Sequence, residues 1–189
     1  MTEPFPVEKT KLCVGLFLAS EAVFFALLIL AYVYYKPAVS SGPTAASSLH
    51  PEVTAFYTAA LIASSFTVSA AGREARRQAY GAFAGWMFAT IGLGIIFLVG
   101  QIREYLDMLR HSVTVHRNIF GTSFYTLTGF HGFHVFVGLV CLLLVVLSAA
   151  FGQSGRKELV ALEAVSWYWH FVDVVWIVIF SIVYLWTFL

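Results

Sequence analysis

Long hydrophobic stretches and short polar segments alternate along the 189 residues of the chain. Five stretches are apolar over nearly their whole length: 12–35, 53–71, 80–100, 122–150 and 164–188. A helix needs about 20 mostly apolar residues to cross the hydrocarbon core of a bilayer, and each stretch has about that length. The pattern predicts an all-α integral membrane protein, a bundle of five transmembrane helices that forms a single domain.

The composition agrees with this fold class. Hydrophobic residues make up 60% of the chain, charged residues make up 11%, and the mean hydropathy is +0.83. Soluble domains carry about 25% charged residues, which places this chain among membrane proteins. The net charge is +1, and Lys and Arg lie between the hydrophobic stretches rather than in one patch, which argues against nucleic-acid binding.

Lys and Arg are divided unequally between the two sides of the predicted bundle. Seven lie in the N-terminal segment and in the loops after the second and fourth stretches: Lys9, Lys11, Arg73, Arg76, Arg77, Arg156 and Lys157. Four lie on the opposite side: Lys36, Arg103, Arg110 and Arg117. Because positively charged loops stay in the cytoplasm, we expect a cytoplasmic N-terminus and a C-terminus outside.

Small residues four apart occur in the third and fourth stretches. The pairs are Gly81 with Gly85 and Thr128 with Gly132. Small residues at this spacing let the backbones of neighbouring helices approach closely. Both pairs therefore predict helix–helix contacts.

Five ionisable residues lie well inside the predicted spans: Glu21, His131, His134, His170 and Asp173. A charged side chain near the centre of a bilayer costs about 3 kcal/mol or more, so we expect these residues to face the bundle or a partner. His170 and Asp173, in the sequence WYWHFVDVVW, are three residues apart on one helix face and are expected to hydrogen-bond each other.

Three chemical roles compete with a structural one for these residues. A haem between His170 and a histidine of the fourth stretch would need two imidazoles that face each other. A carboxylate-bridged metal would need Glu-x-x-His motifs, which the chain lacks. A proton relay through the desolvated Glu21 would need a continuous path. A structural role needs only polar contacts between helices, each worth about 0.6–2 kcal/mol, and the residues alone favour this role.

Four blocks of sequence resemble subunit III of haem-copper terminal oxidases. Residues 163–186, EAVSWYWHFVDVVWIVIFSIVYLW, closely resemble the last helix of that subunit. Residues 120–140, FGTSFYTLTGFHGFHVFVGLV, are similar to the helix before it. LASEAVFFALLILAYVYY at 18–35 resembles the helix that carries the family's buried glutamate, and LVGQIREY at 98–105 also fits.

The resemblance implies a non-catalytic subunit of a proton-pumping oxidase, cytochrome c oxidase, in the inner membrane of a bacterium. Haem and copper belong to subunits I and II of such enzymes, so this chain is expected to bind no metal. It is expected to pack mainly on subunit I, also to meet subunit II, to bind phospholipid, and to support proton uptake. Quinol oxidases and nitric-oxide-reductase-associated homologues carry related subunits and remain alternatives. A stand-alone proton channel or carrier is the alternative of a different class.

The resemblance also assigns roles to individual residues. Glu21 corresponds to the family's buried carboxylate, which reacts with hydrophobic carbodiimide and is not a catalytic base. The remaining polar residues are expected to be structural and to face lipid or a partner subunit: His131, His134, Glu163, His170 and Asp173.

The chain departs from many relatives at two places. They have two further helices before the block that begins here at Lys11, so this chain resembles a short five-helix form. The missing pair forms part of the lipid cleft in the longer form. The segment DMLRHSVTVHRN at 107–118 has no clear counterpart, and the amphipathic pattern of 102–120 predicts a segment that lies along the membrane surface.

Overall fold

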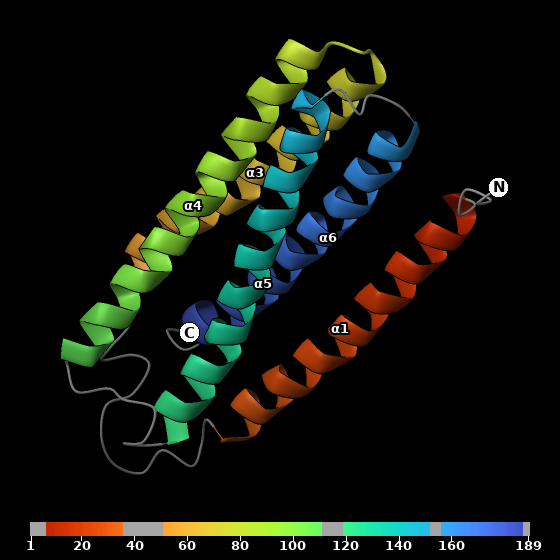
Figure 1. The fold of residues 1–189 in the computed structure, drawn as a ribbon. Coiled ribbons are helices and arrows are strands. Elements are labelled where there is room, and N and C mark those ends of the chain that lie inside the picture. The colour runs from red at the N-terminus through yellow and green to blue at the C-terminus, as the bar shows by residue number, and fades with distance from the viewer. Residues whose placement is uncertain (1–6, 36–50, 111–118, 152–155, 187–189) are drawn as a thin grey trace.

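The computed structural model describes residues 7–35, 51–110, 119–151 and 156–186. They form five long helices: α1 (Val7–Tyr35), α3 (Pro51–Arg76), α4 (Tyr80–Arg110), α5 (Ile119–Ala150) and α6 (Arg156–Phe180). The π-helical turn η2 (Ser181–Leu185) continues α6. All five helices are long and apolar enough to cross a membrane, which confirms the predicted fold class (Figure 1).

Four of the helices are longer than the hydrophobic stretches that predicted them, and α6 begins eight residues before its stretch. The largest difference is at α4, which continues for ten residues beyond the predicted end at 100. The expectation that 102–120 lies along the membrane surface was therefore wrong for 102–110, and 111–118 lie outside the described residues. Main-chain hydrogen bonds propagate a helix wherever side chains permit, so it does not stop where its residues become polar.

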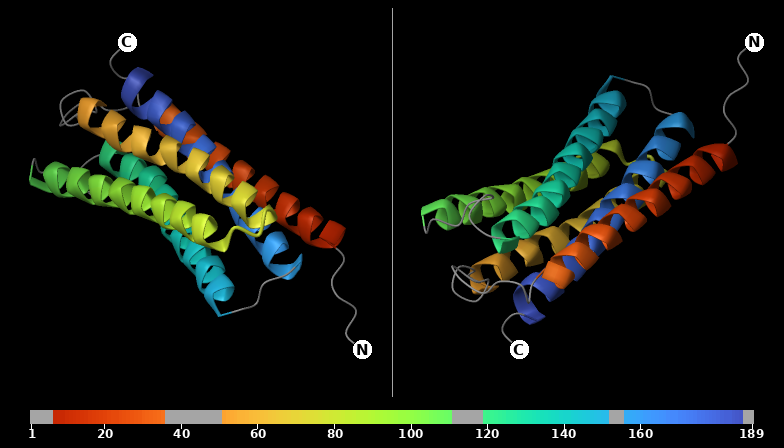
Figure 2. Two further views of the ribbon diagram at one scale, coloured as in Figure 1. Left: turned by 90° about the horizontal axis from the view of Figure 1, so that it is seen from above. Right: turned by 90° about the horizontal axis from the view of Figure 1, so that it is seen from below.

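Four of the helices form a ring. α3 packs on α4, α4 on α5, α5 on α6, and α6 on α3. α1 lies against α5 and α6, on the side of the bundle away from α4 (Figures 1 and 2). Large fully buried side chains, Trp169 and Trp176 among them, fill the interior. Of the α1 segment that would cross the membrane, only 6% is buried within this chain.

The closest helix contacts involve glycines, but only some of the predicted ones. A Cβ atom at Gly132 would lie 2.6 Å from Oε1 of Gln101, so the close approach predicted for α5 is confirmed. At Gly81 and Gly85, a Cβ atom would meet nothing within 4 Å, so among the described residues no helix of this chain makes the contact predicted for that pair. On α4 the tight contacts are at Gly94, where a Cβ atom would lie 2.8 Å from Leu139, and at Gly100, where it would clash with the ring of Tyr57.

Candidate functional site

The five intramembrane residues expected from the sequence lie on three helices, and the structure sorts them into three groups. Glu21 of α1 meets His134 of α5. His170 and Asp173 of α6 both contact Ser65 of α3. His131 of α5 lies apart from both groups and is fully buried.

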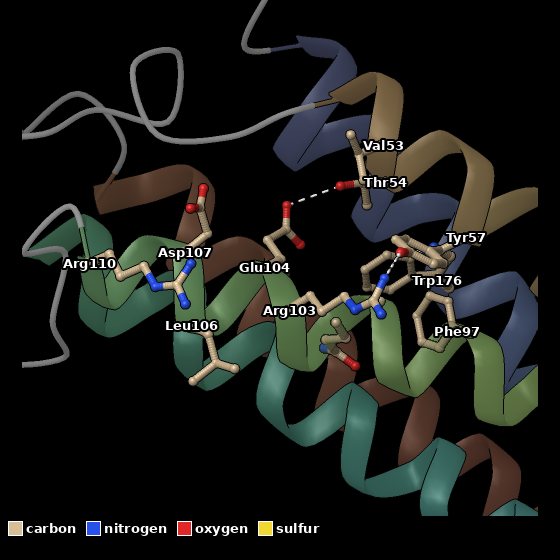
Figure 3. A pocket seen from close by; sticks show the side chains of 12 residues that line it. Val53, Thr54, Tyr57, Phe97, Arg103, Glu104, Leu106, Asp107, Arg110 and Trp176 are labelled. Atoms are coloured by element: carbon tan, nitrogen blue, oxygen red, sulfur yellow. Dashed lines mark hydrogen bonds between the residues drawn. The ribbon is translucent and has the colours of Figure 1, made fainter.

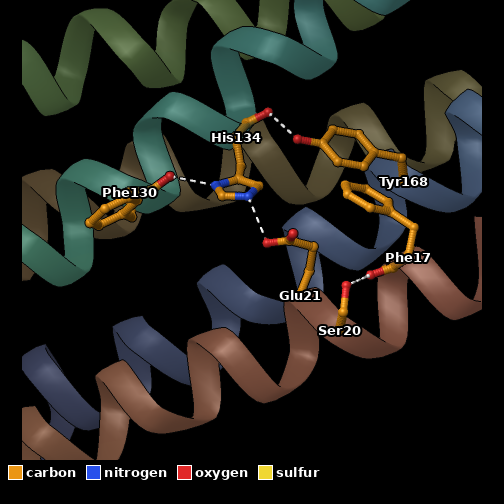
Figure 4. A network of polar contacts seen from close by, with 6 residues as sticks. All are labelled: Phe17, Ser20, Glu21, Phe130, His134 and Tyr168. Atoms are coloured by element: carbon orange, nitrogen blue, oxygen red, sulfur yellow. Dashed lines mark hydrogen bonds and ion pairs between the residues drawn. The ribbon is translucent and has the colours of Figure 1, made fainter.

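Glu21 and His134 form the only polar contact that the described residues make between α1 and α5. Oε2 of the carboxyl group lies 3.1 Å from Nε2 of the imidazole. The two side chains are only 21% and 12% exposed, respectively. Figure 4 shows the pair between the two helices, beside the rings of Phe17 and Tyr168.

The contact of the other ring nitrogen of His134 shows how many protons this pair holds. Nδ1 is 2.7 Å from the carbonyl oxygen of Phe130. A carbonyl oxygen can only accept, so Nδ1 carries a hydrogen, and Nε2 of the neutral imidazole carries none. A bare Nε2 and a carboxylate cannot hydrogen-bond each other. One proton must therefore lie between Glu21 and His134, either on the carboxyl group or on an imidazolium.

Glu163 has a partner that the sequence did not reveal. The ammonium group of Lys11 lies 2.9 Å from Oε1 of Glu163 and joins the N-terminal parts of α1 and α6. The same ammonium group lies 5.9 Å above the ring of Trp167. α1 is thus attached by polar contacts at two depths, here and at Glu21.

His170 and Asp173 do not meet as the sequence predicted. Nδ1 of His170 lies 3.0 Å from the hydroxyl oxygen of Ser65, which also hydrogen-bonds Oδ2 of Asp173. Nε2 of His170 lies 3.3 Å from the hydroxyl oxygen of Ser69. His170 and Asp173 of α6 thus face two serines, four residues apart, on α3. The hydroxyl group of Ser65 joins the carboxyl group of Asp173 to the imidazole of His170. Sequence reasoning missed both serines, whose four-residue spacing was the available signal.

His131 sits among aromatic rings at the centre of the bundle. Its ring stacks on Trp176 at 4.8 Å and meets Phe97 edge to face at 5.8 Å. Within the part of the chain described, neither ring nitrogen has a hydrogen-bond partner. The three intramembrane imidazoles therefore have separate surroundings, and none is positioned opposite another as paired haem ligands would be.

A further acid, Glu104, was missed because it lies beyond the hydrophobic stretch of α4. Oε1 accepts a hydrogen bond from Thr54 at 3.0 Å, and Oε2 accepts one from Tyr184 at 2.7 Å. These bonds join α4 to α3 and η2. Glu104 lines a cavity of about 430 Å³ that has an apolar floor of Phe97 and Trp176 (Figure 3).

A second cavity, of about 380 Å³, lies at the opposite end of α3 and α6. His170 and Glu163 of α6 line it, together with Ser69, Arg73 and Arg76 of α3. It is on the same side as the N-terminal end of α1. Across residues 7–35, 51–110, 119–151 and 156–186, no three His, Cys, Asp or Glu side chains gather as a metal-binding group.

Comparisons with known proteins identify the family. The family described as cytochrome c oxidase subunit III matches residues 4–188. Cytochrome c oxidase subunit 3 of Synechocystis sp. is 38% identical over 177 residues, which cover 91% of this chain and 73% of the relative. Cytochrome c oxidase subunit 3 of Corynebacterium diphtheriae is 36% identical over 171 residues, 89% of this chain and 83% of the relative. The probable cytochrome c oxidase subunit 3 of Mycobacterium leprae is 34% identical over 171 residues, with coverages of 88% and 83%. The chain therefore belongs to the cytochrome c oxidase subunit III family.

Proposed function

We propose that this chain stabilises subunit I of a bacterial haem-copper oxidase and supports proton uptake into it. Haem and copper would lie on subunits I and II, and this chain would not be catalytic on its own. Cytochrome c is the proposed electron donor, in agreement with the names of the relatives.

The observation that carries this proposal is the way in which three acids of the helices are bound. Glu21, Glu104 and Asp173 each hydrogen-bond a side chain of another helix of this chain. These bonds hold α1 to α5, α4 to α3, and α6 to α3. Acids used in this way fix the register of helices, which is the work expected of a structural subunit.

The outer surface supports the same proposal. Large apolar side chains are exposed along α1 and α5, among them Leu16, Leu27 and Leu30 of α1 and Phe133 and Phe136 of α5. Within a bilayer such a surface meets lipid tails or the apolar face of another subunit. We assign it to membrane lipid and to subunit I, with subunit II and further membrane subunits as additional partners.

The charge distribution supports the orientation. Arg73, Arg76 and Lys11 lie at the end of the bundle that carries the N-terminus of α1. Under the positive-inside rule, this end is cytoplasmic and the C-terminus lies outside. Protons enter a pump of this kind from the cytoplasm, so the 380 Å³ cavity would face the side of uptake.

Phospholipid is the proposed ligand of the bundle surface. The 430 Å³ cavity combines the guanidinium groups of Arg103 and Arg110 with the apolar floor of Phe97 and Trp176. A headgroup phosphate at the arginines would leave the acyl chains beside the aromatic rings.

The experiment that tests the proposed function is a mild detergent purification through a tag at the C-terminus. Mass identification of the co-purified chains and an optical spectrum follow. We expect haem bands together with a large histidine-rich membrane subunit and a copper-binding subunit. Haem that stays with this chain alone, or proton transport by the chain alone in vesicles, would contradict the proposal.

A matched strain without this subunit tests its role. We expect oxygen reduction to begin at a rate close to normal and then to decline faster during turnover. An initial rate that is lost completely would indicate a catalytic role instead.

A further inference from the structure

We infer that Asp173, Ser65 and His170 form a proton-binding site that exchanges with the 380 Å³ cavity at the N-terminal end of the bundle. The ligand is a single proton, shared between the carboxyl group and the imidazole through the serine hydroxyl. The inference deepens the proposed function, because it rests on that proposal for the use of the proton during uptake.

The hydroxyl hydrogen of Ser69 is already used in a hydrogen bond within α3. Its Oγ donates to the backbone carbonyl of Ser65 at 2.9 Å. The contact between Ser69 Oγ and His170 Nε2 can then form only if Nε2 carries a hydrogen and donates it. Neutral imidazole has one N–H, so Nδ1 of neutral His170 would be bare.

Two arrangements satisfy the remaining contacts. If His170 is neutral, Ser65 donates to Nδ1, and Asp173 must be a carboxylic acid that donates to Ser65. If Ser65 donates to an ionised Asp173, then Nδ1 must donate to Ser65, and His170 must be an imidazolium. Both arrangements contain one proton more than a carboxylate and a neutral imidazole do. With the four contacts of Ser65 and Ser69 formed at once, the site therefore holds a bound proton, whichever group carries it.

Access to the site is from one end. His170 and Ser69 line the cavity, whereas Asp173 lies behind them and is only 4% exposed. Beyond Ser65 toward the opposite membrane surface, the next fully buried residues of α3 are Ser64, whose hydroxyl donates to the backbone carbonyl of Leu61, and the apolar Leu61 itself. Across the part of the chain described, Oδ1 of Asp173 has no hydrogen-bond partner that would extend the chain of bonds. The geometry is that of a binding site with one entrance rather than of a channel.

The charged groups around the site have both signs. Arg73 and Arg76 of α3 and Glu163 of α6 line the cavity, and Lys11 of α1 pairs with Glu163. On the α1 and α5 side of α6, the titratable groups include the paired Glu21 and His134 and the buried His131, which stacks on Trp176.

Isotope labelling tests the inference sharply, because the chain contains only two aspartates, Asp107 and Asp173. The full chain is produced with a ¹³C label in the aspartate carboxyl groups and ¹⁵N-labelled histidine, and is reconstituted into phospholipid nanodiscs. Infrared spectra at neutral pH detect a labelled carboxylic acid, and ¹⁵N NMR reports the hydrogens on His170. Asp107→Asn and Asp173→Asn assign the infrared band, and His170→Gln assigns the NMR signals.

We expect either a labelled carboxylic acid band that disappears in Asp173→Asn and persists in Asp107→Asn, or a doubly protonated His170. Either result demonstrates the shared proton. The inference is overturned if Asp173 is a carboxylate and His170 carries a single hydrogen in the same sample.

Ser65→Ala tests the bridge without removing either titratable group, with Ser148→Ala as the control. Ser148 donates only to the backbone of its own helix α5, through a 2.9 Å bond to the carbonyl of Val145. We expect Ser65→Ala to shift both the labelled Asp173 carboxyl band and the His170 ¹⁵N signals, because the two groups then lose the hydroxyl that joins them, and Ser148→Ala to leave both unchanged. Unchanged spectra in both variants would overturn the role of Ser65. These spectra are recorded on the chain alone, so their failure is distinct from a failure of the assembled oxidase to form.

Discussion

Replacing Glu21 by alanine removes the attachment of α1 to α5 at mid-helix. α1 is the least buried of the five helices, and its other ion pair, between Lys11 and Glu163, lies at a more exposed position. In the alanine variant, Nε2 of His134 loses its partner, and this side chain is only 12% exposed in the native chain. The variant therefore tests whether a single buried pair holds this helix in place.

The magnitude follows from two contributions. An interhelical polar contact in a membrane is worth about 0.6–2 kcal/mol. Leaving a buried polar group unpaired costs about 1–3 kcal/mol, and the two contributions overlap because they describe the same bond. We therefore expect Glu21→Ala to destabilise the docking of α1 by roughly 1–3 kcal/mol, about a 5- to 150-fold change in its equilibrium.

Glu21→Gln is the matched control. The carboxamide N–H can donate to the bare Nε2 of His134, so the hydrogen bond survives without the shared proton. We expect the glutamine variant to lose less than about 1 kcal/mol. The assay is the fraction of this chain retained by the oxidase over a graded series of detergent concentrations, together with oxygen consumption over time.

The expected result is that Glu21→Ala dissociates at lower detergent concentration and loses activity faster during turnover, while its initial rate stays near normal. The reasoning is refuted if Glu21→Gln dissociates as readily as Glu21→Ala, because the hydrogen bond would then be irrelevant. It is also refuted if the alanine variant assembles normally and its initial rate falls more than tenfold, because Glu21 would then act in the reaction itself.

Three further substitutions test other parts of the bundle. Asp173→Leu should destabilise the chain by about 1–3 kcal/mol by breaking the α6–α3 contact, and unchanged thermal stability and complex yield would contradict that contact. Gly100→Ala should destabilise it by about 1–3 kcal/mol because its Cβ would meet the ring of Tyr57, whereas Gly81→Ala, in open space, should be neutral or slightly stabilising in the same thermal melt. Arg103→Leu should reduce the phospholipid that native mass spectrometry finds on the purified oxidase; Arg77→Leu, outside that cavity, should not.

The number and type of helices were predictable because bilayer thickness sets the length of an apolar span. Their ends were not, since polar residues such as Arg103 and Asp107 are compatible with a helix that continues beyond the hydrocarbon core. The hydropathy pattern measures where a helix is apolar, and the hydrogen bonds of the backbone determine where it stops.

The important residues of the candidate site were largely predictable, but their pairings were not. An ionisable residue inside an apolar span is conspicuous, which identified Glu21 and Asp173 from the sequence alone. That Glu21 meets His134, 113 residues away, depends on the order and rotation of helices, which the sequence pattern does not specify. Ser65 carries no charge, and serines are common in such spans, so only its four-residue spacing from Ser69 pointed to a position between Asp173 and His170.

Glu21, Glu104 and Asp173 are paired between helices for a reason that applies to membrane proteins in general. Apolar surfaces are as stable against lipid as against each other, so the hydrophobic effect does not determine how the helices of a membrane protein fit together. Register must come from close contacts such as that at Gly100 and from polar bonds such as those of Glu21, Glu104 and Asp173. A subunit that has to offer an apolar surface to its partner cannot rely on that partner to order its own helices. Placing the acids between helices orders the bundle from within and leaves its outer surface free for lipid and for the oxidase.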